Sequence, residues 1–139
     1  MGDEKEKWVD AITRLTKLTQ ENKLEWRSTS ADNLMVEDEL QRIESVFVGE
    51  HSNKQLRLYK KRFKVEQPPA TSIAATIGLI TQRKYPYWAS QIYLELIDSY
   101  GHTLWTFPEV SALRDLFSAV KYQVSGVEDL LKDLLKGED

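Results

Sequence analysis

The spacing of apolar residues along the chain predicts one helix near its start and two near its end. In the first helix, expected to begin at Asp3 and to stop at Asn22, apolar residues recur every three to four positions: Trp8, Ala11, Ile12, Leu15 and Leu18. The same spacing returns in two sets separated by Gly126: Leu113, Leu116, Phe117, Val120 and Val124, then Val127, Leu130, Leu131 and Leu134. Such stripes are typical of amphipathic helices that face a core, so all three are expected to be buried.

Between these helices, apolar and polar residues alternate with the two-residue period of strands. Five strands are expected, over residues 24–28, from 45 onward, 56–65, 88–98 and 104–107. His51-Ser52-Asn53 and Asp98-Ser99-Tyr100-Gly101 have the composition of turns and join neighbouring strands as antiparallel hairpins. Along 56–65 the apolar residues change from one face to the other, which predicts a bulge or a twist near the edge of the core.

Two segments fit neither period. Residues 30–44 are compatible with a short acidic helix or with a loop, and we expect a loop with one helical turn. Pro68-Pro69 ends the preceding strand, because proline cannot donate to a ladder of hydrogen bonds. The apolar insertion that follows, at about 70–85, has a structure that its pattern does not predict.

The order of the elements predicts an α+β fold: an N-terminal helix, a mostly antiparallel sheet of about five strands, and two C-terminal helices packed on one face. With 139 residues, the chain is interpreted as a single domain, 1–139. Its 22 acidic and 19 basic side chains leave a formal net charge of −3. No apolar run approaches the roughly 20 residues of a membrane span, and the first residues lack the apolar stretch of a signal peptide. We therefore expect a cytoplasmic protein that makes no contact with a membrane.

A series of short motifs runs through the last third of the chain. They are Leu104-Trp105-Thr106-Phe107-Pro108, Val110-Ser111-Ala112-Leu113, Asp115-Leu116, Ala119-Val120, Tyr122-Gln123-Val124 and Gly126-Val127-Glu128-Asp129-Leu130-Leu131. Together with Leu56-Arg57-Leu58-Tyr59 and Leu94-Glu95-Leu96, this series resembles a family of small bacterial single-domain proteins that has no assigned activity. The resemblance implies a bacterial α+β domain and transfers no catalytic residue. The insertion at 70–85 departs from the family pattern.

The sequence carries no pattern typical of an enzyme. Without cysteine there is no thiolate nucleophile, no disulfide and no cysteine-ligated metal site. The glycines are scattered singly and form neither a phosphate-binding loop nor a nucleophile elbow. His51 and His102 lie in predicted turns near Glu50 and Asp98, and acid–base or metal chemistry would require further convergence with carboxylates. We interpret both histidines as exposed turn residues, and we expect no enzymatic activity, metal or cofactor.

Residues 54–64 form a basic segment that contains six cations, no acidic residue and the aromatic residues Tyr59 and Phe63. Such a surface can bind phosphates and stack bases. On it, Lys60, Arg62 and Lys64 are expected to share one face of the strand. The alternative is a solvated face whose charges prevent edge-to-edge aggregation. Nucleic-acid binding through 54–64 is the second hypothesis for function.

The first hypothesis concerns the apolar insertion. Its large side chains include Ile73, Ile77, Leu79 and Ile80. If they are exposed, they form an apolar patch larger than a monomer normally presents, which would mark a protein–protein surface. The alternative is packing on the sheet of the same chain. The preferred interpretation is a non-enzymatic interaction module that binds a protein partner or, as a homo-oligomer, a second copy of itself.

Overall fold

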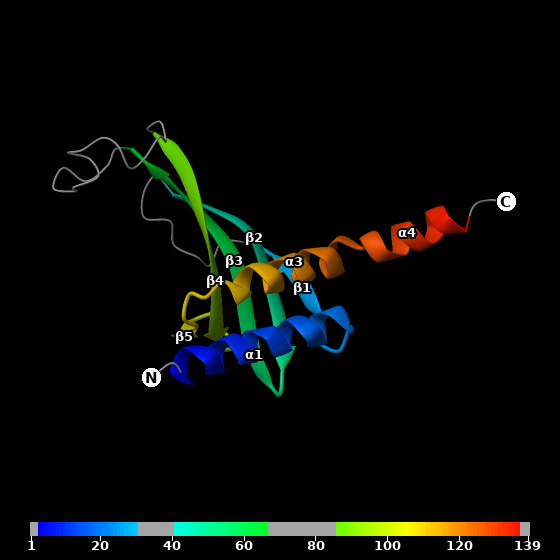
Figure 1. The fold of residues 1–139 in the computed structure, drawn as a ribbon, viewed down its shortest axis with the longest axis horizontal. Coiled ribbons are helices and arrows are strands. Elements are labelled where there is room, and N and C mark those ends of the chain that lie inside the picture. Colours follow the sequence, from blue (N-terminus) through cyan, green and yellow to red (C-terminus); the bar gives the residue numbers. More distant parts are fainter. Residues whose placement is uncertain (1–2, 31–40, 67–85, 137–139) are drawn as a thin grey trace.

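The computed structural model describes residues 3–30, 41–66 and 86–136. In these ranges the chain forms one helix, then five strands, then two helices (Figure 1). The bounds are α1 Asp3–Gln20, β1 Trp26–Thr29, β2 Gln41–His51, β3 Lys54–Val65, β4 Tyr87–Ile97, β5 Thr103–Thr106, α3 Ala112–Ser125 and α4 Val127–Leu135. The α+β class and the order of its elements are confirmed.

The strands form one antiparallel sheet whose order follows the chain, β1-β2-β3-β4-β5. The hairpin between β2 and β3 turns at the predicted place, where Ser52 and Asn53 have positive φ angles of 51° and 64°. Positive φ at both central residues is the geometry of the tight turn that matches strand twist. At the opposite end from this turn, the sheet reaches beyond the helices (Figure 1). We call this part, residues 41–45, 60–65 and 87–92, the protruding end.

The expected irregularity lies in β2 rather than in β3. The register of this pair shifts at Ser45, between Glu44 and Val46, and Ser45 has a φ of 50°. β3 pairs with β4 without a break. The change of face along β3 has a different cause, because this strand carries buried side chains on both sides: Leu56 and Leu58 toward the helices, Arg57 and Tyr59 away from them.

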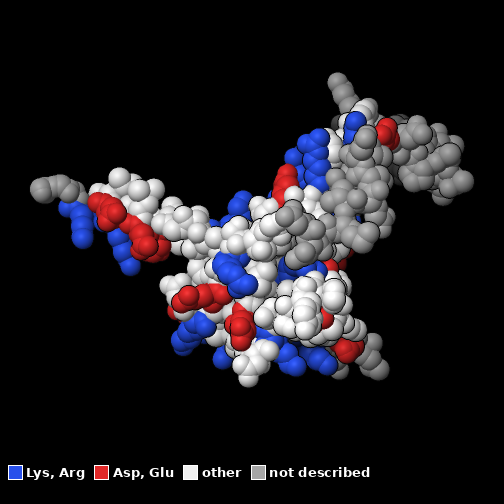
Figure 2. Space-filling model, turned by 180° about the vertical axis from the view of Figure 1, so that it is seen from behind, with Lys and Arg blue, Asp and Glu red and all other residues white. Residues whose placement is uncertain are grey.

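Helices α1 and α3 pack against each other and cover one face of the sheet (Figure 1). Helix α4 follows α3 but projects away from the rest of the molecule, as the view from behind also shows (Figure 2). α4 contains no buried residue. The expectation that both C-terminal stripes are buried is therefore right for α3 and wrong for α4.

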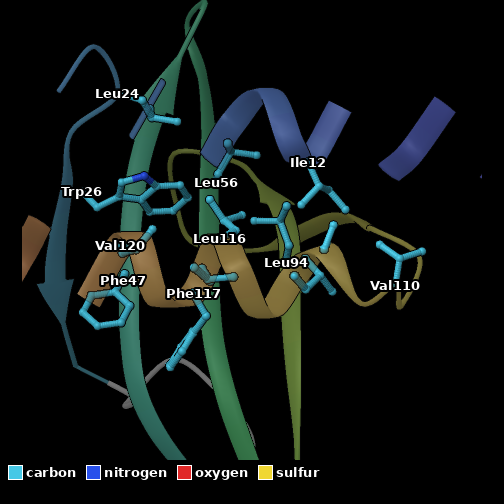
Figure 3. Close-up of a cluster of buried hydrophobic side chains, with 13 residues drawn as sticks. Ile12, Leu24, Trp26, Phe47, Leu56, Leu94, Val110, Leu116, Phe117 and Val120 are labelled. Atoms are coloured by element: carbon cyan, nitrogen blue, oxygen red, sulfur yellow. The ribbon is translucent and has the colours of Figure 1, made fainter. Parts of the chain in front are cut away.

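The core lies between the sheet and the pair α1 and α3, and side chains from all three converge there (Figure 3). The rings of Phe47 in β2 and Phe117 in α3 meet edge to face, with centroids 5.8 Å apart. The most completely buried apolar side chains are Ile12, Leu24, Leu58, Leu94, Leu116 and Val120. At the side of the core, Trp8 of α1 contacts the rings of Trp105 and Phe107.

The residues of α1 that are buried differ from the apolar stripe predicted from the sequence. Its buried residues are Ile12, Thr16 and Thr19, whereas Ala11 is exposed. Each threonine hydroxyl donates to the backbone carbonyl four residues earlier, at 2.9 Å and 2.8 Å. Because these bonds use the hydroxyl donors within the helix, threonine can be buried on this side of α1. Beyond α1 the chain turns at Asn22, whose φ is 59°.

A hydrogen-bond network centred on Gln123 fixes the connection between α1 and β1 to α3. The backbone N–H of Trp26 donates to Oε1 of Gln123 at 2.7 Å, and Nε2 of Gln123 donates to the carbonyls of Thr19 and Leu24. The indole N–H of Trp26 donates to the hydroxyl of Thr19 at 3.0 Å. Gly49 lies opposite Trp26, and a Cβ there would come within 2.9 Å of the indole. The glycine is therefore needed for the indole to lie on the sheet.

Several predicted boundaries require correction. Residues 41–44, expected to be a loop, form the start of β2, because they pair with β3 as far as Phe63. Long-range pairing here decides the structure of a segment with little pattern of its own. β1 begins two residues later than expected and β5 one residue earlier. The rest of the predicted loop, 31–40, and the insertion at 70–85 lie outside the described residues.

Candidate interaction surfaces

The first candidate surface is the leucine face of α4, which consists of Val127, Leu130, Leu131, Leu134 and Leu135. Their exposed fractions range from 37% for Val127 to 77% for Leu135. The spacing of three and four residues places all five on one side of the helix. Scattered exposed leucines are ordinary, but a contiguous apolar stripe on a projecting helix is typical of a contact surface.

The junction between α3 and α4 explains why the leucine face is separated from the core. Gly126 has a φ of 74°, in the left-handed region that glycine adopts without strain, and it ends α3. The N–H of Val127 donates to the hydroxyl of Ser125 at 3.2 Å, so Ser125 helps to start α4. Glu128 accepts a hydrogen bond from the hydroxyl of Tyr122 at 2.8 Å. These contacts fix the start of α4 locally without bringing its apolar side to the sheet.

The second candidate surface is the basic face of the protruding end. Lys60, Arg62 and Lys64 are alternate residues of an unbroken strand, so they share one face as predicted. Arg42 of β2 lies directly opposite Arg62 and joins them.

The guanidinium groups of this surface are held by an indole. The Cζ atoms of Arg42 and Arg62 lie 5.1 Å and 5.3 Å from the ring centroid of Trp88, within the range of cation–π attraction. Arg62 also forms an ion pair with Glu44 at 3.2 Å, and both side chains are about 40% exposed. Trp88 thus positions two like charges side by side at an accessible part of the sheet.

The basic face continues into a groove between the helices and the sheet. The groove has a volume of about 620 Å³, and Lys60, Lys5 and Arg114 line it together with one acidic residue, Glu109. Its other polar lining residues are Ser90, Gln91, Ser111 and Ser118. Beside the groove, the amines of Lys60 and Lys121 lie 5.7 Å and 5.8 Å from the centroid of Phe117.

Arg57, a member of the basic segment in the sequence, does not belong to this surface. Its side chain and that of Glu95 are more than 90% buried and form an ion pair at 2.7 Å. Arg57 also donates to the carbonyl of Gly101 and the hydroxyl of Thr103. Tyr59 donates to the second oxygen of Glu95 at 3.0 Å, and burial, reinforced by this carboxylate, raises the pKa of Tyr59. The cluster ties the β4–β5 turn to β3 and holds Arg57 in a buried ion pair on the face of the sheet away from the helices.

The two histidines occupy exposed positions at different turns. His102 Nδ1 lies 3.3 Å from Asp98, the acidic residue identified in the sequence. Asp98 accepts backbone N–H groups of His102 and Tyr100, which hold the pKa of its carboxyl group below the usual value. This is a turn-closing arrangement. Within 3–30, 41–66 and 86–136, no three metal-ligating side chains converge, and no helix is both long and apolar enough to cross a membrane.

Part of these two surfaces could be predicted from the sequence. The row Lys60, Arg62 and Lys64 was identified from the sequence, but Arg42, which lay in a predicted loop, and Trp88 were not. The sequence did not indicate that α4 is exposed, because the apolar stripe of α4 has the same period as the buried stripe of α3. The candidate contact residues of the insertion, Ile73, Ile77, Leu79 and Ile80, lie outside the described residues.

No family model, curated protein or solved structure matches the chain. The resemblance of the C-terminal motifs to a bacterial family therefore stays a prediction. The case for function consequently depends on the two surfaces.

Proposed function

We propose that the chain is a non-enzymatic interaction module of the bacterial cytoplasm that pairs with a second copy of itself through α4. The observation that supports this most directly is the leucine face, an apolar stripe without a buried residue on a helix that projects from the core. A second copy of the same helix offers the complementary apolar surface, and an isologous contact of this kind closes as a dimer.

The charges beside the leucine face favour an antiparallel pair. Glu128 and Lys132 lie one turn apart along the same border of the stripe. In an antiparallel pair, Glu128 of each copy lies beside Lys132 of the other, and the helix dipoles oppose each other favourably. A parallel pair would bring the acidic first turns together, with Glu128 and Asp129 of both copies at one end.

The size of the stripe indicates a dimer of moderate affinity. Full burial of one leucine side chain contributes about 1.5–3 kcal/mol, and association costs about 4–15 kcal/mol. A pair of nine-residue helices buries its apolar side chains only in part. We therefore expect a dissociation constant of roughly micromolar order.

Sedimentation of the full chain over a wide concentration range tests the proposal. The wild type should shift from monomer to dimer, whereas Leu131→Ser with Leu134→Ser should weaken the dimer roughly a hundredfold or more. The matched control, Asp129→Ser with Asp133→Ser, changes the opposite side of α4 and should still dimerise. A wild type that stays monomeric throughout, or a leucine variant that dimerises as well as the control, would refute the proposal.

A charge swap tests the antiparallel arrangement. Glu128→Lys and Lys132→Glu should each weaken the dimer, because each places like charges beside each other across the pair. The double variant should restore dimerisation to near the wild-type value. Failure of the double variant to recover, with dimerisation of the wild type intact, would reject the antiparallel arrangement.

A further inference from the structure

The protruding end of the sheet concentrates positive charge in a chain that is negative overall. Four cations, Arg42, Lys60, Arg62 and Lys64, lie on its face toward the helices, and the one acidic residue among them in the described ranges is Glu44. The formal net charge of the chain is −3. Among the described residues of this end, cations therefore outnumber acidic side chains, and the resulting local field attracts anions.

The arrangement of charges on this surface lowers the stability of the fold. Like charges directly opposite each other on neighbouring strands are destabilising, and Arg42 and Arg62 are such a pair. Glu44 neutralises one guanidinium group, and the indole of Trp88 holds both. An anion bound between them would relieve the repulsion through charge-assisted hydrogen bonds, in which arginine favours phosphate.

The extent of the basic surface indicates a polymer rather than a single anion. Alternate residues of a strand are about 7 Å apart, so Lys60, Arg62 and Lys64 form a row about 14 Å long. At Lys60 the row enters the groove of about 620 Å³ that is also lined by Lys5 and Arg114. The positive track thus bends from the open sheet into the space beside α1 and α3, past the polar side chains of Ser90 and Gln91.

We propose that this track binds the phosphate backbone of single-stranded nucleic acid. A single strand can follow a track that bends into a groove, whereas a duplex is stiff over about 150 base pairs. Basic grooves with aromatic side chains are a common means of binding single strands without sequence preference. Trp88 acts here as a positioning residue for Arg42 and Arg62. The inference does not depend on pairing through α4.

Fluorescence anisotropy with a labelled oligothymidylate tests the inference on the full chain. The triple variant Arg42→Gln, Arg62→Gln, Lys64→Gln should bind at least tenfold more weakly at low salt. The slope of log affinity against log salt should fall in magnitude by about 2, because each lost phosphate contact contributes about 0.7. The matched control Lys7→Gln, Arg14→Gln, Lys23→Gln removes the same charge from exposed positions elsewhere and should retain affinity within about twofold.

Four results would overturn the inference. These are no binding by the wild type at low salt, an equal loss in the control variant, equal affinity for a duplex of the same length, and equal affinity for polyglutamate. Equal affinity for polyglutamate would indicate a surface that binds acidic peptides. If circular dichroism shows that the triple variant does not fold, the single variants Arg42→Gln and Lys64→Gln are measured instead. Each should lower the magnitude of the slope of log affinity against log salt by about 0.7.

Discussion

Helices α3 and α4 have the same apolar period, follow each other across one glycine, and have opposite environments. α3 buries Ala112, Leu113, Leu116, Phe117 and Val120, whereas α4 buries none of its residues. The period of a stripe therefore identifies which side of a helix is apolar, but it does not identify what covers that side. In α3 the apolar side packs on the sheet and on α1, whereas no described part of the chain buries the apolar side of α4.

Truncation of an aromatic side chain in α3 should have the largest effect. Phe117 is buried against Phe47, and Phe117→Ala should lower the free energy of unfolding by about 3–5 kcal/mol through lost burial and the cavity left behind. Leu134→Ala in α4 removes an exposed side chain and should change the stability of the monomer by less than about 0.5 kcal/mol. Urea denaturation at low protein concentration measures both. Similar losses would mean that the two helices do not differ in burial.

Loss of the Gln123 amide should have the next largest effect. Gln123→Ala leaves the N–H of Trp26 and the carbonyls of Thr19 and Leu24 without this partner, at a cost of about 1–3 kcal/mol. The amide protons near Trp26 should also exchange faster with solvent. Tyr122→Phe, one residue earlier and exposed, serves as the control and should leave both measurements close to wild type.

Replacement of the glycine between the helices should have a smaller effect. Gly126→Ala places a Cβ on a residue with a φ of 74°, although no atom lies within 4 Å of the added carbon. The cost is therefore conformational, about 1 kcal/mol, and Gly126→Asn should recover part of it because asparagine tolerates this region. Thermal melts of wild type, Gly126→Asn and Gly126→Ala should rank their stabilities in that order. A variant with alanine as stable as wild type would mean that the α3–α4 junction adopts another geometry.

Alkaline pH should weaken the sheet beneath α3 slightly. The pKa of Tyr59 is raised above its ordinary value of about 10, so the folded state retains the phenolic proton more tightly than the unfolded chain. The resulting stabilisation is complete below about pH 10 and is lost as the pH rises above it. The stability advantage of wild type over Tyr59→Phe should therefore shrink as the pH rises above about 10 in urea titrations.

The sequence predicted the fold class because most elements carry their own pattern. The stripe of α3, the alternation in β4 and the Ser52-Asn53 turn each depend on residues close in the chain. Predictions failed where distant residues decide the outcome. The start of β2 depends on pairing with β3, and the burial of Arg57 depends on Glu95, which is far from it in sequence.

The candidate surfaces were predicted less completely than the fold. Alternation on a strand placed Lys60, Arg62 and Lys64 together, because the two-residue period alone determines that face. The contributions of Arg42 and Trp88 required knowledge of the strand order and register. No local signal separates the exposed stripe of α4 from the buried one of α3, since both have the same spacing.

The Gln123 network has a consequence for the order of folding during synthesis. Gln123 bonds to residues about a hundred positions earlier in the chain, and α1 packs on α3. The native contacts of α1 can therefore form only after α3, near the end of the described chain, has been synthesised. Until α3 leaves the ribosome, the apolar face of the sheet lacks the helix that packs against β1 and β4. Contacts of such long sequence separation slow folding and leave apolar surface exposed during translation. The nascent chain should therefore depend on chaperones until its C-terminal helices emerge.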